Sequence, residues 1–105
     1  MELPNITGEL PVAITILEGQ HPLRLKQVSM RQITVGQSLK VQSDLKTNQW
    51  VAVGEIAAMV HLVDESGTTY PLTYEALESS SRQNLDYLVG LRTQLDAKEQ
   101  AESLD

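Results

Sequence analysis

Hydrophobic residues alternate with polar or small residues in the first third of the chain. The alternating positions of the first such segment are Val12, Ile14 and Ile16. A turn-rich connector over 18–22 leads to a second alternating segment that starts at Leu23. β-Branched residues in this pattern indicate half-buried strands, and a short connector between two strands indicates a hairpin. The pattern predicts a β-hairpin over 12–33, preceded by an irregular lead-in over 1–10.

The second strand of this hairpin changes its pattern midway. Leu23 and Leu25 share one parity, whereas Val28 and Met30 have the other. One extra residue near Gln27 would return both pairs to the same face, as a β-bulge does. We therefore predict a bulge in the second strand at this point.

From Thr34 onward, apolar residues recur at three- and four-residue steps, which is typical of helices. A first helix is expected over 35–45, with Thr34 as its N-cap. The strongest helical signal follows over 50–63, with Asn48 as the expected cap and Gly67 as a left-handed stop. The apolar positions of this second helix are Trp50, Val53, Ile56, Ala57, Val60 and Val63.

The last third of the chain predicts two further helices. The segment 68–71 is expected to be extended, because the proline at its end disfavours a helical residue before it. Thr73 then begins a short helix through Glu78, and a serine run separates it from a final helix that starts at Arg82. The polar residues 96–105 are expected to form a frayed acidic tail.

These elements together predict an α+β fold, in which an N-terminal β-hairpin packs on a small bundle of three to four α-helices. Residues 1–105 form a single domain with a helical part over 34–95, because the chain has the length of one domain and shows no internal boundary.

Charge and composition narrow the classes of partner. Residues 1–46 carry five Lys or Arg and four Asp or Glu, whereas residues 47–105 carry three and ten, so the total of −6 is the sum of +1 in the first part and −7 in the second. An acidic surface repels phosphate backbones, and no nucleic-acid partner is expected. No segment is long and apolar enough to span a membrane, and no signal peptide is visible, so a cytoplasmic protein is expected.

Candidate chemistry is sparse. The chain has no cysteine and two histidines, and it contains no nucleophile elbow, phosphate-binding loop or dinucleotide-binding motif. His61 lies three and four residues before Asp64 and Glu65, which would place the three side chains on one helical face. This spacing is common by chance, and a partly buried or surface helix position explains His61 better. We expect no catalytic residues, no metal and no cofactor.

Two apolar features suggest protein binding. The predicted final helix carries a narrow leucine stripe with Tyr87 beside it, and it contains Gly90, which is costly inside a helix unless a neighbour packs closely there. The stripe consists of Leu85, Leu88, Leu91 and Leu95. It either docks on the domain's own core or fills a groove on a partner. Trp50 is the second candidate, although a buried core position explains a lone Trp better.

Three short motifs follow one another along the chain. They are Arg31, Thr34, Val35 and Gly36 at the first predicted helix, Leu72, Thr73 and Leu77 at the short helix, and the Asp86-Tyr87 pair within the final helix. With a middle helix rich in Ile, Ala and Val between them, these motifs resemble the tail assembly chaperones of Mu-like long-tailed bacteriophages and prophages. The resemblance covers roughly residues 12–95, and the chain departs from the family pattern in the serine run before Asp86-Tyr87.

The resemblance implies a non-catalytic helper protein. Such chaperones bind the tape measure protein in the host cytoplasm, keep its hydrophobic helices from aggregating, and are absent from the finished particle. A thin core also benefits from burial between copies, so a homo-oligomer is a further expectation. Two alternatives stay open, namely a structural tail or neck protein retained in the virion, and a small metal-assisted hydrolase that uses His61, Asp64 and Glu65.

Overall fold

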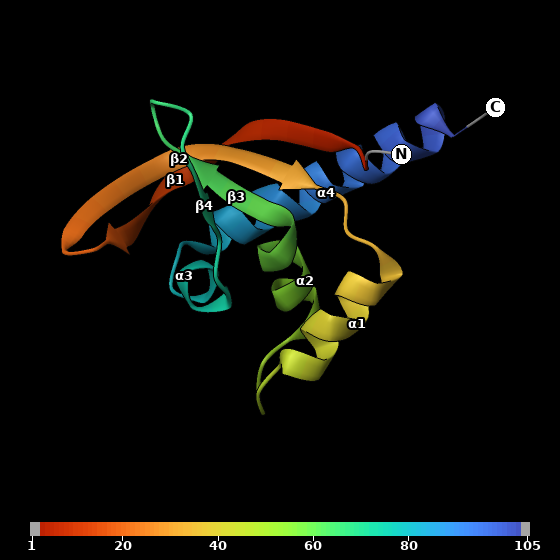
Figure 1. The fold of residues 1–105 in the computed structure, drawn as a ribbon, viewed down its shortest axis with the longest axis horizontal. Helices are drawn as coiled ribbons and strands as arrows, with labels where there is room; N and C mark the ends of the chain where they lie inside the picture. The colour runs from red at the N-terminus through yellow and green to blue at the C-terminus, as the bar shows by residue number, and fades with distance from the viewer. Residues whose placement is uncertain (1–2, 104–105) are drawn as a thin grey trace.

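The computed structural model describes residues 3–103, and within them four strands and four helices alternate in groups. In chain order they are β1 (Asn5–Glu18), β2 (His21–Arg31), α1 (Val35–Asp44), α2 (Val51–Met59), β3 (Val60–Val63), β4 (Thr69–Pro71), α3 (Tyr74–Glu78) and α4 (Arg82–Glu102). Figure 1 shows the sheet lying across the long helix α4, with the shorter helices grouped beneath it.

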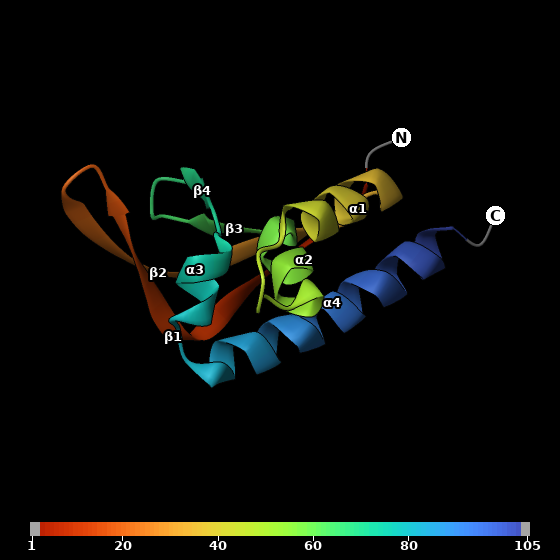
Figure 2. The same ribbon diagram turned by 90° about the horizontal axis from the view of Figure 1, so that it is seen from below.

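The four strands form one antiparallel sheet in the order β1-β2-β3-β4, so each strand pairs with its neighbour in the chain. One face of the sheet is buried, because Val60 and Leu62 of β3 are covered while His61 between them is exposed. Helices α3 and α4 pack against the strands, α2 packs on α3 and α4 and adds buried residues to the same core, and α1 lies outside them on α2 (Figures 1 and 2). The predicted α+β class is confirmed.

The first strand begins earlier than the sequence pattern predicts. Residues 5–9 pair with residues 27–31 of β2, so most of the expected irregular lead-in over 1–10 is strand. Within this segment Gly8 marks a close approach, because a Cβ atom at this position would clash with the Tyr87 hydroxyl. Residues 1 and 2 of the lead-in lie outside the described residues.

The irregularity of the hairpin lies at the expected position along the strand pair, but the extra residues are on the other strand. Glu9 pairs with Gln27 and Ile14 pairs with Leu25, so residues 10–13 of β1 lie opposite Lys26 alone. The extra residues therefore belong to β1, and the prediction of an insertion in β2 is wrong. The parity change was real, since both Leu25 and Val28 are buried.

The predicted helix over 50–63 is wrong in its last turn. Helix α2 ends at Met59, and Val60–Val63 form β3, which pairs with Gln27–Met30 of β2. Valines at three-residue spacing are compatible with a helix and with a short strand. Here they form a strand, because β2 has an edge that residues 60–63 can pair with. Gly67 has φ 88° in the β3–β4 turn rather than at a helix end.

The starts of three helices agree with the sequence-based predictions. Thr34 caps α1 in a reciprocal capping box with Gln37, Thr73 caps α3, and the Ser81 hydroxyl accepts a hydrogen bond at the start of α4. The expected cap at Asn48 is wrong, because α2 begins after Trp50. The prediction of a frayed tail over 96–105 is also wrong as far as Glu102, because α4 continues to that residue. Residues 104–105 lie outside the described part.

The core is one continuous cluster between the sheet and the helices. It joins leucines of α4 to buried residues of β1, β2, β3, α2 and α3, whereas α1 and β4 contribute no buried residue. Its fully buried members include Leu10, Met30, Ile56, Leu62, Leu88 and Leu95. Among the described residues, no helix has both the length and the hydropathy that crossing a membrane requires.

Candidate functional site

Helix α1 is attached to the domain through one face only. Its residues Val41 and Leu45, the latter at the C-cap, approach Gly54 of α2 so closely that a Cβ atom there would lie 3.0 Å from each side chain. Every residue of α1 nevertheless stays at least partly exposed. The close approach at Gly54 holds α1 on α2, and it leaves a second apolar face of α1 without cover.

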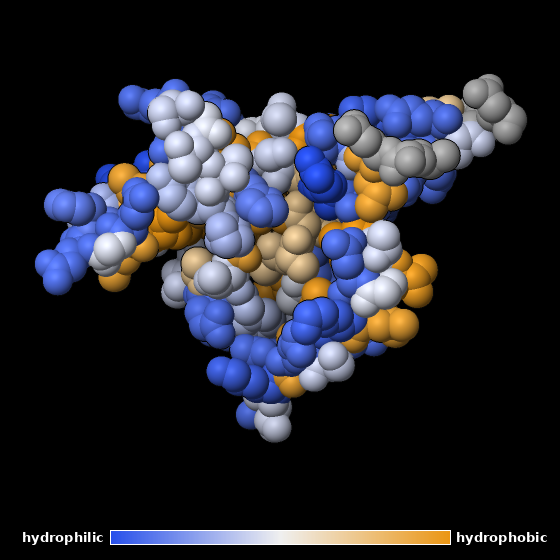
Figure 3. All heavy atoms as spheres, viewed as in Figure 1, coloured by the Kyte–Doolittle hydropathy of each residue, from blue (hydrophilic) through white to orange (hydrophobic). Residues whose placement is uncertain are grey.

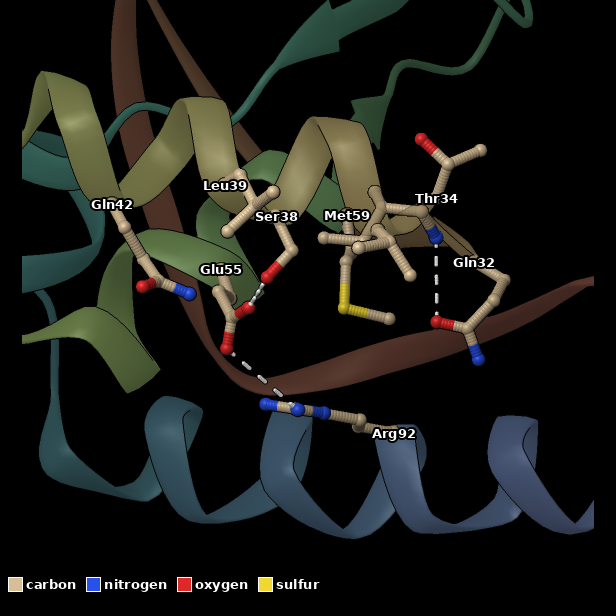
Figure 4. A pocket seen from close by; sticks show the side chains of 10 residues that line it. Gln32, Thr34, Ser38, Leu39, Gln42, Glu55, Met59 and Arg92 are labelled. Atoms are coloured by element: carbon tan, nitrogen blue, oxygen red, sulfur yellow. Dashed lines mark hydrogen bonds and ion pairs between the residues drawn. The ribbon is translucent and has the colours of Figure 1, made fainter.

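That second face carries Val35 and Leu39, which lie one turn apart on α1. Their side chains are 79% and 58% exposed, which is unusual for neighbouring large apolar residues. They line a groove of about 350 Å³ between α1 and α4, together with Ile33 and Met59. Figure 4 shows Leu39 and Met59 in this groove, with Arg92 of α4 on its other side. The space-filling view shows hydrophobic residues at the surface over α1 (Figure 3). We call this the α1–α4 groove.

The floor of the α1–α4 groove is polar but electrically balanced. Glu55 of α2 accepts a hydrogen bond from the Ser38 hydroxyl of α1 and forms an ion pair with Arg92 of α4. The Arg92 Nη2 atom lies 3.9 Å from Glu55 Oε1 (Figure 4). Because each charge has its partner, the groove offers apolar contact without a free charge. Such a surface suits the apolar face of an amphipathic helix.

A second groove lies on the other side of α2, next to α3. It has a volume of about 330 Å³, and its lining includes Trp50, Tyr74 and Leu85. Trp50 is 73% exposed, although its main chain is fixed, because its amide donates a hydrogen bond of 2.9 Å to the Tyr74 hydroxyl. We call this the Trp50 groove.

The structure divides the six predicted partner-binding residues among the core, the Trp50 groove and a contact between α4 and β1. Leu88, Leu91 and Leu95 are buried in the core, so this part of the stripe docks on the chain's own sheet and is not a free surface. Trp50 and Leu85, far apart in the sequence, meet in the Trp50 groove. The interpretation of Trp50 as a buried core residue is therefore wrong.

Tyr87 is half-buried and serves the fold. Its hydroxyl accepts a hydrogen bond of 3.0 Å from the Glu9 amide, which ties α4 to β1. Gly90 is exposed, and a Cβ atom there would have no neighbour within 4 Å, so no close packing explains this glycine.

From the sequence, Val35 and Leu39 share one short apolar face of the predicted first helix with Val41 and Leu45, so the exposed pair is not predicted. At 100° per residue, however, positions 35 and 39 point away from positions 41 and 45. This angular split was a signal that the helix has two separate apolar faces.

Of the two carboxylates expected beside His61, Asp64 is engaged elsewhere. His61 lies on β3 rather than on a helix, so its spacing to Asp64 and Glu65 does not gather the three side chains on one face. The Asp64 carboxylate instead accepts hydrogen bonds from the amides of Ser66 and Thr68 in the β3–β4 turn. Within residues 3–103, no three His, Asp or Glu side chains are placed to share a metal ion.

The shifted titrating groups of the described chain are Asp64 in this turn and Tyr70 in β4. Tyr70 hydroxyl lies 3.0 Å from Asp64 Oδ2 and 3.2 Å from Glu18 Oε2, so one phenolic proton lies between two carboxylates. The hydrogen bond from the Ser66 side chain lowers the pKa of Asp64; burial opposes this effect, and the Tyr70 hydroxyl adds to it. Burial, followed by the hydrogen bonds to Asp64 and Glu18, raises the pKa of Tyr70 to about 12.

Comparison of the chain with protein-family models, with curated proteins and with solved structures finds no match in any of the three.

Proposed function

We propose that this chain is a non-catalytic assembly chaperone that holds an apolar helical segment of a partner protein in the α1–α4 groove. The observation that carries the proposal is the pair Val35 and Leu39, exposed one turn apart beside a groove whose only charges are paired. Apolar side chains of a partner helix would be covered there without leaving a charge unpaired.

The partner in this proposal is the tape measure protein of a long-tailed phage or prophage, bound in the host cytoplasm before tail assembly. The short motifs around Thr34, Thr73 and Tyr87 support this choice through their resemblance to tail assembly chaperones. The net charge of −6 supports it physically, because like charges keep complexes of a holder and an apolar client apart in solution.

Co-expression with the tape measure protein of the same phage or prophage tests the proposal. We expect this chain to raise the soluble fraction of the tape measure protein and to co-purify with it. Leu39→Glu places a charge in the groove and is expected to abolish both effects. Leu17→Glu is the matched control, because Leu17 is 72% exposed but lies on the hairpin, away from the groove.

An unchanged soluble fraction of tape measure protein in the presence of this chain would overturn the proposal. Equal loss with Leu39→Glu and Leu17→Glu would overturn the choice of groove. Mass spectrometry of purified particles separates the chaperone from a structural tail or neck protein, because stoichiometric copies in the virion contradict an assembly helper.

A further inference from the structure

The Trp50 groove combines an exposed aromatic side chain on a fixed main chain with a carboxylate that forms no ion pair within residues 3–103. Trp50 is anchored through its amide to Tyr74, and the preceding loop is fixed by reciprocal hydrogen bonds between Lys46 and Gln49. The indole therefore projects into solvent from a fixed main chain. An aromatic side chain on a fixed main chain has only two side-chain torsions left to order, so it makes a large contact at low cost in conformational entropy.

Glu78 of α3 lines the same groove, and it forms no ion pair within residues 3–103. Arg82 also lines the groove, but its Nη1 atom lies 2.6 Å from Asp86 Oδ2, and its side chain is largely exposed. The charge left over at the groove is negative. Residues 47–105, which contain the whole groove, carry three Lys or Arg against ten Asp or Glu, so the surrounding field has the same sign.

We infer that the Trp50 groove receives a lysine or arginine side chain of a partner protein, with an adjacent apolar residue of the partner lying on Val53 and Leu85. The cation stacks on the indole face and is paired by the Glu78 carboxylate. The lysine or arginine stem and its apolar neighbour cover the half-buried floor of the groove. The partner chemistry is thus a basic, partly apolar peptide segment.

This inference goes beyond the proposed function, because it concerns a second groove on the other side of α2 and a charged rather than an apolar contact. The two proposals also fail separately. Leu39→Glu leaves the Trp50 groove unchanged, and substitutions at Trp50 or Glu78 leave the α1–α4 groove unchanged.

Intrinsic fluorescence provides a direct test, because Trp50 is the only tryptophan of the chain. The probes are three acetylated, amidated heptapeptides of leucine and alanine that differ only at the same two positions. These two positions hold arginine in the first peptide, glutamine in the second and glutamate in the third. We expect a saturable change in Trp50 emission with the arginine peptide and none with the glutamate peptide. The affinity for the arginine peptide should fall as salt is raised toward about 1 M.

Two variants and their matched controls assign the contact. Trp50→Leu, followed by isothermal titration calorimetry, is expected to weaken the arginine peptide at least about fivefold, and Glu78→Gln about two- to fivefold. Leu17→Ala is the control for Trp50, because the two side chains are equally exposed. Glu65→Gln in the β3–β4 turn is the control for Glu78. Both controls should bind as the parent chain does.

Several outcomes would overturn the inference. They are equal binding of the three peptides, no saturable response to the arginine peptide at millimolar concentration, and equal weakening by Glu78→Gln and Glu65→Gln. Amide chemical shifts that move along the acidic end of α4 instead of at the Trp50 indole would show attraction to the general acidic surface and would also overturn it.

Discussion

At the scale of single residues, Tyr70 joins the two hairpins of the sheet. Its hydroxyl contacts Glu18 at the end of β1 and Asp64 at the end of β3. The phenol is favoured in its protonated form there, because an ionised phenolate would face two carboxylates. Burial and these hydrogen bonds raise the pKa of Tyr70 from its ordinary value of 10.0 to about 12.

This shift predicts a loss of stability at alkaline pH. Since the folded pKa lies above the unfolded one, the contribution of Tyr70 is fully present below pH 10 and is lost as pH rises through about 12. Urea unfolding of the parent chain and of Tyr70→Phe should therefore show a stability difference that falls steadily over this window. The other tyrosines are common to both proteins and cancel. A difference that stays constant from pH 9 to 12 would contradict the prediction.

At the scale of elements, side chains of α4 accept hydrogen bonds from β1 amides where the regular pairing of β1 with β2 is interrupted. Residues 10–13 of β1 leave the regular register with β2. Backbone amides within and next to this stretch therefore need other acceptors. Asn84 Oδ1 accepts from the Val12 amide at 3.0 Å, and the Tyr87 hydroxyl accepts from the Glu9 amide at 3.0 Å. The bulged strand and the helix therefore depend on each other.

Gly8 and Tyr87 are predicted to be energetically coupled. Gly8→Ala places a methyl group against the Tyr87 hydroxyl and should destabilise the fold by about 1–3 kcal/mol. Tyr87→Phe leaves the Glu9 amide without its acceptor and should cost about 0.5–1.5 kcal/mol. In the double variant the hydroxyl is gone, so the loss measured by urea unfolding should be smaller than the sum. Additive losses would show that the two residues act independently.

The elements that the sequence predicts well are those with local signals. Thr34, Thr73 and Ser81 each cap a helix through hydrogen bonds within three residues, so the pattern around them is sufficient. Residues 5–9 and 60–63 become strands only because β2 lies between them with two edges to pair. That pairing is distant in the sequence, and no local period contains it.

For the candidate site, the sequence identifies candidate residues, but whether each is exposed or buried depends on how distant elements pack. Trp50 was a candidate because the chain has no other tryptophan, but its exposure depends on where α3 and α4 lie. Leu88 and Leu95 were candidates as an apolar stripe, and a stripe of this kind fits a core and a partner equally. Only the packing of α4 on the sheet decides that these leucines are internal.

At the scale of the whole molecule, α4 reaches from the α3 end of the sheet past the start of β1 (Figures 1 and 2). Its last turns contact segments from the beginning of the chain. Lys98 Nζ donates to the Asn5 carbonyl at 2.8 Å, and Gln32 Nε2 donates to Asp96 Oδ1 at 2.8 Å and to Glu99 Oε1 at 3.1 Å. These polar turns thus hold the start of β1 and the segment that leads into α1.

Deletion of residues 96–105 is therefore predicted to destabilise the fold, although every core leucine of α4 remains. The loss of three hydrogen bonds between partly exposed groups should cost about 1–3 kcal/mol in urea unfolding. Hydrogen exchange should also accelerate at the amides of Gln32 and Thr34, since the Gln32 side chain is released next to the cap of α1. Deletion of residues 103–105 is the control, because it begins where α4 ends and should leave both measurements unchanged. Equal stability of the two truncated chains would mean that the last turns of α4 fray in solution, and that the position of α1 beside its groove does not depend on them.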